Sequence, residues 1–269
     1  MSTTSDLLVE RTPDGVMSVT FNRPAVKNAL TFAMCRELIG VLEELRTGTA
    51  TRVLVLRGAG SDFCSGADLK EVSALVLPDA TARSAAATTQ VRELSMPLFL
   101  ALHAVPQPVV CSVRGYAVGA GMQFALLSDL VVAAHAARFV LPQVRLGHSV
   151  DHGESWALPR RVGVGRAMQL MALGESVSGQ EAERFGLANW VVPDEQLEEK
   201  TADIVRRLAS GATVAIREMK ELLRGALERP FPAQFDAEAR ALGVCAASAD
   251  FAEAIGAFMA KRQPSFAGR

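Results

Sequence analysis

Short segments rich in apolar residues recur through the first half of the chain, and the first two end at turn-forming residues. The runs occupy residues 16–21, 53–56, 109–113 and 130–134. Runs of this length are typical of strands that are buried on both faces of a sheet. The pattern therefore predicts a sheet assembled from these four segments.

Between the predicted strands, apolar residues change to helical spacing. A helix is predicted over 32–46, where apolar residues recur every three or four positions and Thr31 can cap the first turn. Residues 85–102 and 119–127 also predict helices. Alternation of strand, helix and strand is typical of α/β domains with parallel pairing, so the predicted fold class is α/β.

Beyond about residue 160 the strand pattern stops, and helical spacing continues to the end of the chain. Helices are predicted over residues 165–173, 179–185, 194–210, 213–228 and 233–260. We therefore predict two parts, a mixed core over residues 1–200 and a helical region over residues 201–269. Apolar faces on such a region favour packing against a neighbouring subunit.

The charge balance excludes some classes of partner. The 269 residues include 28 Lys and Arg against 29 Asp and Glu, which gives a net charge of -1. This balance provides no field for nucleic acid or an anionic membrane surface, so neither is predicted as a partner. No apolar run is long enough to cross a bilayer, and the N-terminus, MSTTSDLLVERTPDG, predicts no secretory signal.

The cysteine pattern indicates a reduced protein. Cys35, Cys64, Cys111 and Cys245 show neither paired spacing nor histidine partners at metal-ligand spacing. We therefore expect free thiols, no metal site and a cytoplasmic location. Cys64 lies inside a glycine motif but has no histidine near it in sequence, so a buried packing role is expected. The dinucleotide fingerprint is absent, so no nicotinamide cofactor is predicted.

Two glycine-bearing stretches follow predicted strands. Residues 63–70 read Phe-Cys-Ser-Gly-Ala-Asp-Leu-Lys, and residues 115–123 read Gly-Tyr-Ala-Val-Gly-Ala-Gly-Met-Gln. A helix start leaves unpaired N–H groups at the positive end of the helix dipole. Two such groups that converge on one point bind a carbonyl oxygen, and bind it more tightly as it gains negative charge. Either stretch alone also fits simple packing of small residues.

The order of the two stretches, about 50 residues apart, makes the pattern more specific. With further segments they resemble the crotonase superfamily of enoyl-CoA hydratases and isomerases over nearly the whole chain. Those further segments are residues 21–24, 28–30, 173–175, 182–187, 191–193 and 258–262. The resemblance implies a crotonase spiral of β-β-α turns, a C-terminal helical trimerisation region, and a homotrimer or a hexamer made of two trimers.

The resemblance also places a thioester site on this sequence. It implies an oxyanion hole made by the backbone N–H groups of Ala67 and Ala120, and an acyl tunnel along residues 71–105. It places the coenzyme A nucleotide near Val26, Lys27, Ser65, Asp68, Leu69 and Lys70, with Phe258 and Lys261 arriving from a neighbouring subunit. An acyl-CoA is then the substrate, and no cofactor beyond its coenzyme A is expected. Taken singly, the lysines also fit an ordinary solvated surface.

The chain departs from the hydratases of this superfamily at two positions. They use two glutamates, and the corresponding residues here are Gln123 and Gln143. A glutamine amide can orient water or substrate by hydrogen bonds, but it does not exchange a proton near neutral pH. The two replacements together predict a reaction other than two-carboxylate hydration, or no reaction.

Asp151 is the predicted acid/base. It occupies a place where dienoyl-CoA isomerases and the ring-expanding isomerases of phenylacetate degradation carry an aspartate that moves a proton. The following segment, residues 155–163, resembles the second group most. The structural alternative is that Asp151 caps a nearby helix.

Other titratable residues surround Asp151. His152 and Glu154 stand where those relatives usually have glycines. Glu154 is a second candidate base, and His148 and His152 are further candidates because imidazole titrates near neutral pH. For both histidines the alternative is a partly exposed loop residue.

Three functions follow from these observations. The preferred one is an acyl-CoA isomerase that passes through a thioester enolate, because Asp151 supplies a group that can carry the proton. The second is an atypical hydratase in which Gln123 and Gln143 hold the water. The third is an acyl-CoA binding protein without catalysis.

Overall fold

The computed structural model describes residues 5–269, whose strands form two sheets. The larger sheet contains, in spatial order, β1 (Leu7–Arg11), β2 (Val16–Phe21), β3 (Val53–Gly58), β4 (Val109–Val113), β6 (Leu130–Ala134) and β9 (Trp190–Val192). The smaller sheet contains β5 (Tyr116–Val118), β7 (Arg138–Val140) and β8 (Ser176–Ser178).

Pairing in the larger sheet is parallel from β2 to β9, and β1 pairs antiparallel with β2. Strand β3 shows why both faces are apolar. Leu54 and Leu56 belong to the main hydrophobic core, whereas Val53 and Val55 belong to a second core on the other face. Successive side chains of a strand point to opposite faces, so a sheet covered on both sides needs unbroken apolar runs.

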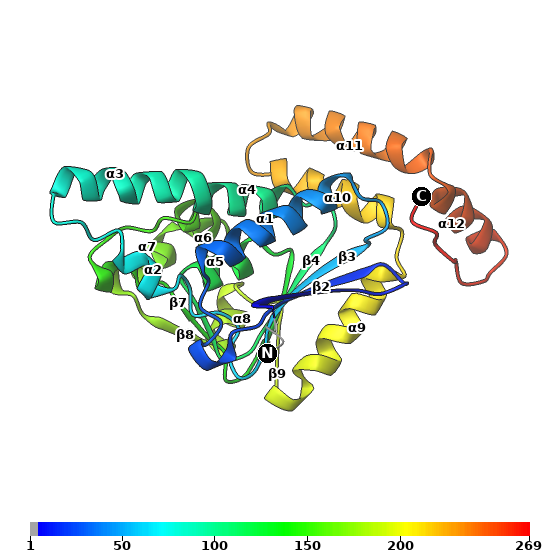
Figure 1. Ribbon diagram of the computed structural model, residues 1–269. Helices are drawn as coiled ribbons and strands as arrows, with labels where there is room; N and C mark the ends of the chain where they lie inside the picture. Colours follow the sequence, from blue (N-terminus) through cyan, green and yellow to red (C-terminus); the bar gives the residue numbers. More distant parts are fainter. Residues whose placement is uncertain (1–4) are drawn as a thin grey trace.

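Helices cover both faces of the larger sheet (Figure 1). The helices of the described residues are, in chain order, α1 (Phe32–Thr47), α2 (Leu69–Ser73), α3 (Ala80–Gln90), α4 (Met96–Ala104), α5 (Ala120–Leu127), α6 (Glu154–Val162), α7 (Val164–Leu173), α8 (Gly179–Phe185), α9 (Leu197–Ala209), α10 (Thr213–Gly225), α11 (Phe231–Ala246) and α12 (Ala249–Met259). Helices α11 and α12 project away from the sheet (Figure 1). Short 3-10 turns occupy Pro24–Val26, Gln143–Leu146 and Asp194–Gln196.

Different helices pack on the two faces of the sheet. Helices α1, α4 and α5 contribute buried side chains to the main core, and α9 alone covers the second core with Leu197, Ile204, Val205 and Ala209. Figure 1 shows α9 on the opposite side of the sheet from α1 and α4. The predicted cap of α1 is confirmed, since the Thr31 side chain accepts from the Met34 N–H.

The prediction that strands end near residue 160 is wrong, because β8 and β9 lie beyond it. Each spans only three residues, which is too short to establish a period of two in the sequence. Their places are fixed by pairing with distant strands, β8 with β7 and β9 with β6.

Two predicted helices are interrupted. The segment 233–260 forms α11 and α12, which are bent by 79° relative to each other. Ser248 starts the second helix by accepting from the Phe251 N–H, which ends the first one. The segment 85–102 becomes α3, a π-helical turn over Val91–Ser95, and α4. Such turns re-aim side chains within a helix and occur frequently at functional sites.

The boundary predicted at residue 200 falls inside α9, and the division into two parts stays a prediction. Among the residues described, no single helix combines the length and apolar character needed to cross a bilayer, although α11 and α12 together pass that test as a bent pair.

Candidate active site

The two glycine-bearing stretches lie side by side. Cys64 and Ala117 form a parallel bridge, in which Cys64 N donates to Tyr116 O at 2.9 Å and Val118 N donates to Cys64 O at 2.9 Å. Both stretches therefore run in the same direction, and their ends reach the same region.

The N–H of Ala67 is free because of its peptide geometry. Leu30 N donates to Gly66 O at 2.8 Å, so the carbonyl of the Gly66–Ala67 peptide faces Leu30. In a trans peptide the N–H points opposite to the C=O, so the Ala67 N–H faces away from Leu30. Within residues 5–269 it has no acceptor.

The N–H of Ala120 is free for a different reason. Ala120 is the first residue of α5, and a first-turn N–H has no acceptor within its helix. None is found for it elsewhere within residues 5–269. A Cβ built on Gly66 would lie 3.8 Å from Ala120 N, which places the two peptides close together. The prediction that the free N–H lies at a helix start is therefore correct for Ala120. Ala67 lies before α2, and its N–H is free because of the bridge with Leu30.

Gly121 permits this close approach of α5 to the first stretch. A Cβ at this position would lie 2.2 Å from Cys64 O, closer than any real contact. Cys64 itself is fully buried, and burial raises its pKa to about 12, so the thiol stays protonated. This agrees with the packing role expected for Cys64.

A pocket joins the two free amides. It is lined by residues from five segments, namely Leu30, Phe32, Cys35, Ala67, Gln90, Leu94, Ser95, Leu98, Phe99, Ala120 and His152. Most of these residues are apolar, as an acyl chain requires. The polar pair Gln90 and Ser95 comes from the π-helical turn region, where Gln90 Nε2 donates to Ser95 Oγ at 3.4 Å.

The two glutamines lie in the interior, Gln123 close to Gly153 and Gln143 close to Gly119. Gln123 and Gln143 are 1% and 4% exposed, so neither is a surface residue. Gln143 Nε2 donates to Glu154 Oε1 at 2.8 Å, and a Cβ on Gly153 would lie 3.2 Å from Gln123 Nε2. In the described part of the chain, the Oε1 atoms of both glutamines are buried without a partner.

Glu154 holds the loop that precedes α6. Its side chain is fully buried, and its second oxygen, Oε2, accepts from the His152 N–H at 2.8 Å. Both carboxylate oxygens are therefore engaged inside the protein. This geometry holds the Glu154 carboxylate between Gln143 and the His152 N–H, and Glu154 is not among the residues that line the pocket.

Asp151 and His152 lie side by side at the edge of the site. Asp151 Oδ1 lies 3.5 Å from His152 Nε2, and the two side chains are 27% and 11% exposed. The helix-capping alternative for Asp151 is wrong, because Gly153 is the N-cap of α6. His148, in contrast, is exposed, and its Nδ1 lies 2.8 Å from Ser149 O.

Possible metal-donor atoms of Asp151, His152 and Glu154 lie within 4.8 Å of one another, a grouping that sequence spacing did not predict. Because both Glu154 oxygens already accept hydrogen bonds, we assign no metal to it.

The residues expected near the nucleotide form one surface around the turn after β2. Ser65 N donates to Lys27 O at 2.9 Å, and Ser65 Oγ donates to Val26 O at 3.3 Å. Lys27 Nζ lies 4.2 Å from the centre of the Tyr116 ring. Leu69 and Lys70, at the start of α2, are exposed. These five expected residues are thus available to a ligand.

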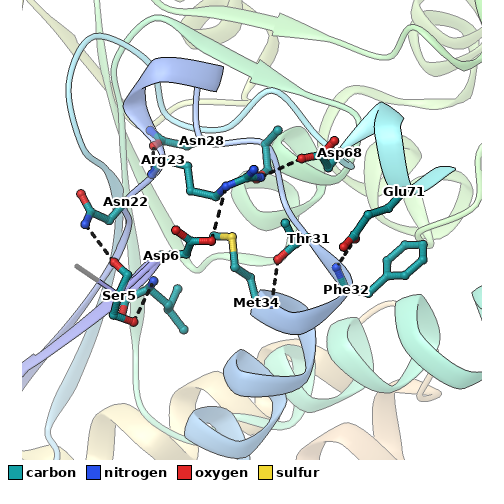
Figure 2. A network of polar contacts seen from close by, with 12 residues as sticks. Ser5, Asp6, Asn22, Arg23, Asn28, Thr31, Phe32, Met34, Asp68 and Glu71 are labelled. Carbon is teal, nitrogen blue, oxygen red and sulfur yellow. Dashed lines mark hydrogen bonds and ion pairs between the residues drawn. The ribbon is translucent and has the colours of Figure 1, made fainter. Parts of the chain in front are cut away.

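The carboxylate of Asp68 is engaged in contacts within the protein. Figure 2 shows Arg23 between Asp6 and Asp68, and the Arg23 Nη1 to Asp68 Oδ2 distance is 2.9 Å. Asp68 Oδ1 also accepts from Lys70 N, which caps α2. The hydrogen bond from Arg23 holds the pKa of Asp68 below its ordinary value. Asp68 therefore fixes the loop that carries Ala67.

Phe258 and Lys261 lie at the other end of the molecule. Figure 1 shows α12 far from α2, and Phe258 is 80% exposed. Within one chain these two residues cannot reach the predicted nucleotide site. Their arrival from a neighbouring subunit stays a prediction.

Asn28, for which the sequence patterns predict no role of its own, joins the turn after β2 to the loop after β3. Its fully buried side chain donates to Ala59 O at 2.9 Å and to Asp62 O at 2.7 Å. It also accepts from Arg23 N at 2.9 Å, with its backbone at φ 57°. The feature of the sequence that could have indicated this residue is an asparagine after a turn, because asparagine tolerates a positive φ angle.

Comparison with known proteins identifies the class. Residues 11–269 match the family Enoyl-CoA hydratase/isomerase. A probable enoyl-CoA hydratase from Rhodobacter capsulatus is 40% identical over 256 residues, covering 95% of this chain and 96% of its own. A 1,2-epoxyphenylacetyl-CoA isomerase from Escherichia coli K12 is 34% identical over 264 residues, covering 98% and 99%.

Solved structures agree with the fold. The crystal structure of enoyl-CoA hydratase from Bacillus anthracis has a TM-score of 0.88 at 32% identity, covering 98% of this chain and 100% of its own. The chain belongs to the enoyl-CoA hydratase/isomerase family within the crotonase superfamily, and it is an enzyme of that family. The predicted fold class and family are confirmed, and the non-catalytic alternative is not retained.

Proposed function

We propose that this enzyme moves a double bond within an enoyl-CoA thioester through an enolate whose oxygen binds the N–H groups of Ala67 and Ala120. One observation carries the proposal. Two backbone N–H groups from separate stretches border the same pocket, and neither has an acceptor within residues 5–269.

The chemistry of an enolate fits such a pair of donors. When a proton leaves Cα, negative charge moves onto the thioester oxygen, and fixed N–H groups bind that oxygen more tightly than the neutral carbonyl. Removal of one donor of this kind lowers kcat about 10²- to 10³-fold. The apolar lining from Leu98 and Phe99 suits the acyl chain.

Asp151 supplies the carboxylate on which the proposed proton transfer depends. Its side chain is mostly buried at the edge of the site, and its Oδ1 is buried without a hydrogen-bond partner in the described part of the chain. Neither Gln123 nor Gln143 can take this role, since an amide does not exchange a proton near neutral pH.

The test removes one donor. Proline lacks an N–H and is accepted at the first position of a helix, so Ala120→Pro removes this donor at a position that suits proline. We expect kcat/KM for isomerisation of a 3-enoyl-CoA to fall about 10²-fold or more. Binding of free coenzyme A should persist, because that ligand has no thioester carbonyl.

Ala249→Pro is the matched control, at the first position of α12. It should leave isomerisation unchanged. Equal turnover by wild type and Ala120→Pro would remove the enolate from the mechanism.

The second candidate is an atypical hydratase. It is favoured by the buried, unpaired Oε1 atoms of Gln123 and Gln143, which can accept hydrogen bonds from a water molecule. Product analysis separates the candidates, since hydration of a 2-enoyl-CoA yields an alcohol and isomerisation yields no new functional group.

Assembly and location complete the proposal. We propose a homotrimer or a hexamer in which α12 of one copy brings Phe258 and Lys261 to the nucleotide of the next. The large exposed apolar residues of α11 and α12, which include Phe231, Phe235 and Phe258, support such packing. We also propose a cytoplasmic location, which the four free cysteines support.

A further inference from the structure

The pocket offers few groups that can carry a proton. Of its eleven lining residues, Cys35 and His152 are those with titratable side chains. Burial and the nearby Glu71 raise the pKa of Cys35 to about 12, so this thiol stays protonated. Imidazole is the side chain that gains and loses a proton near neutral pH.

We propose that His152 is the catalytic residue that takes the proton from the acyl chain and returns it, and that Asp151 positions its ring. This inference rests on the proposed enolate chemistry and names the group that reaches the substrate. It places Asp151 behind His152, because His152 lines the pocket with Ala67 and Ala120, whereas Asp151 does not.

Three contacts hold His152 in place. Its backbone N–H donates to the buried carboxylate of Glu154 at 2.8 Å. Its ring packs against Phe99, with the ring centres 5.5 Å apart. Its Nε2 lies 3.5 Å from Asp151 Oδ1. A ring fixed by backbone, packing and a carboxylate has little freedom to leave the pocket wall.

The two ring nitrogens are in different environments. Nε2 faces Asp151, whereas Nδ1 is buried with no partner in the described part of the chain. When the proton is on Nε2, which lies 3.5 Å from Asp151 Oδ1, the lone pair of Nδ1 is free to act as a base. A buried nitrogen without a partner is unfavourable until a substrate supplies one.

The proton transfer then balances. The Cα–H bond of a 3-enoyl thioester breaks, its proton goes to the imidazole of His152, and its electron pair forms the enolate. The enolate oxygen binds the N–H groups of Ala67 and Ala120, while the Asp151 carboxylate stabilises the imidazolium. The imidazolium returns the proton to Cγ, and the product is the 2-enoyl thioester with neutral His152.

The experiment follows both isomerisation and deuterium uptake in D2O. A panel of short and medium 3-enoyl-CoA thioesters is incubated with the wild type, with His152→Ala and with Asp151→Asn. His135→Ala is the control, because this exposed histidine follows β6 and is not part of the pocket lining. Binding of free coenzyme A reports that each variant is folded.

We expect His152→Ala to lose about 10²-fold or more in kcat, the usual contribution of a positioned acid/base. Added imidazole should restore part of it by entering the space that the ring leaves. Asp151→Asn should lower kcat with little change in KM, and Asp151→Glu should recover part of the loss. An aspartate with only a structural role would not lower kcat while KM stays nearly unchanged.

Two results overturn the inference. One is wild-type kcat in His152→Ala. The other is a loss that imidazole does not restore, since the ring would then only shape the wall. Failure of the wild type to isomerise or exchange any thioester is a separate result, and it contradicts the proposed function itself.

Discussion

Gln143 Nε2 donates a 2.8 Å hydrogen bond to Oε1 of Glu154, and both side chains are buried. The amide at a place where hydratases carry a carboxylate therefore serves as a donor to the carboxylate of Glu154. The pair links the turn after β7 to the start of α6, and through Glu154 it also holds His152. This relationship gives the Gln143 amide a structural partner.

Gln143→Glu should destabilise the protein. It places two buried carboxylates in contact, and two such groups cannot both ionise, so one pKa rises. A carboxyl pKa raised in the folded state makes stability fall as pH increases from about 4 toward that raised value. We expect a loss of about 1–3 kcal/mol at pH 7 relative to the wild type, shrinking in acid, measured by denaturant unfolding.

Adding Glu154→Gln should reverse that loss, because the donor and the acceptor then exchange places. With Gln123→Glu also present, the three changes recreate two glutamates without the repulsion. Hydration of a 2-enoyl-CoA should then rise greatly if the remaining scaffold suits that reaction. No recovery of stability in the Gln143→Glu/Glu154→Gln variant would show that the hydrogen bond is not the relevant contact.

The Arg23–Asp68 pair predicts an acid-sensitive loop. Because the folded protein lowers the pKa of Asp68, the contribution of this group is present above the unfolded pKa of about 4 and is lost as pH falls through the lower folded value. The stability advantage of the wild type over Asp68→Asn should therefore shrink below about pH 4. Unfolding by urea at a series of pH values measures it, and a difference independent of pH would contradict the assignment.

Lys220 fastens α10 to the sheet. Its buried ammonium donates to Gln107 O at 2.8 Å and to Asp129 Oδ2 at 2.5 Å, and the same oxygen accepts from Val109 N at 2.7 Å. Lys220→Ala leaves this carboxylate without its cation and should cost about 3 kcal/mol in the free energy of unfolding. Asp129→Asn added to Lys220→Ala should recover part of the loss, and additive losses would argue against the pairing.

The exposed face of α11 and α12 predicts assembly. Phe235 and Phe258 are 63% and 80% exposed in one chain. A Phe235→Glu/Phe258→Glu variant should shift the molecular mass measured by light scattering toward that of one chain. Val164→Glu, on the exposed start of α7, should not. A molecular mass that the double variant leaves unchanged would place the proposed interface elsewhere.

Much of the fold was visible in the sequence. The buried runs that became β2, β3, β4 and β6 and the amphipathic spacing of α1 are local patterns, because burial of one face or both leaves a period along the chain. The order of the two glycine-bearing stretches and the distance between them along the chain were also visible in the sequence. The short strands β8 and β9 gave no period, so only pairing with distant strands defines them.

The site was predictable in its parts but not in its arrangement. The resemblance of the sequence to the crotonase superfamily indicated the amides of Ala67 and Ala120 and the absence of both hydratase glutamates. Only the tertiary structure decided that Glu154 turns inward to Gln143, and that His152 lies on the pocket wall with Asp151 behind it. Both outcomes depend on contacts between residues on different elements, and spacing along a chain records the face of an element but not its distant neighbour.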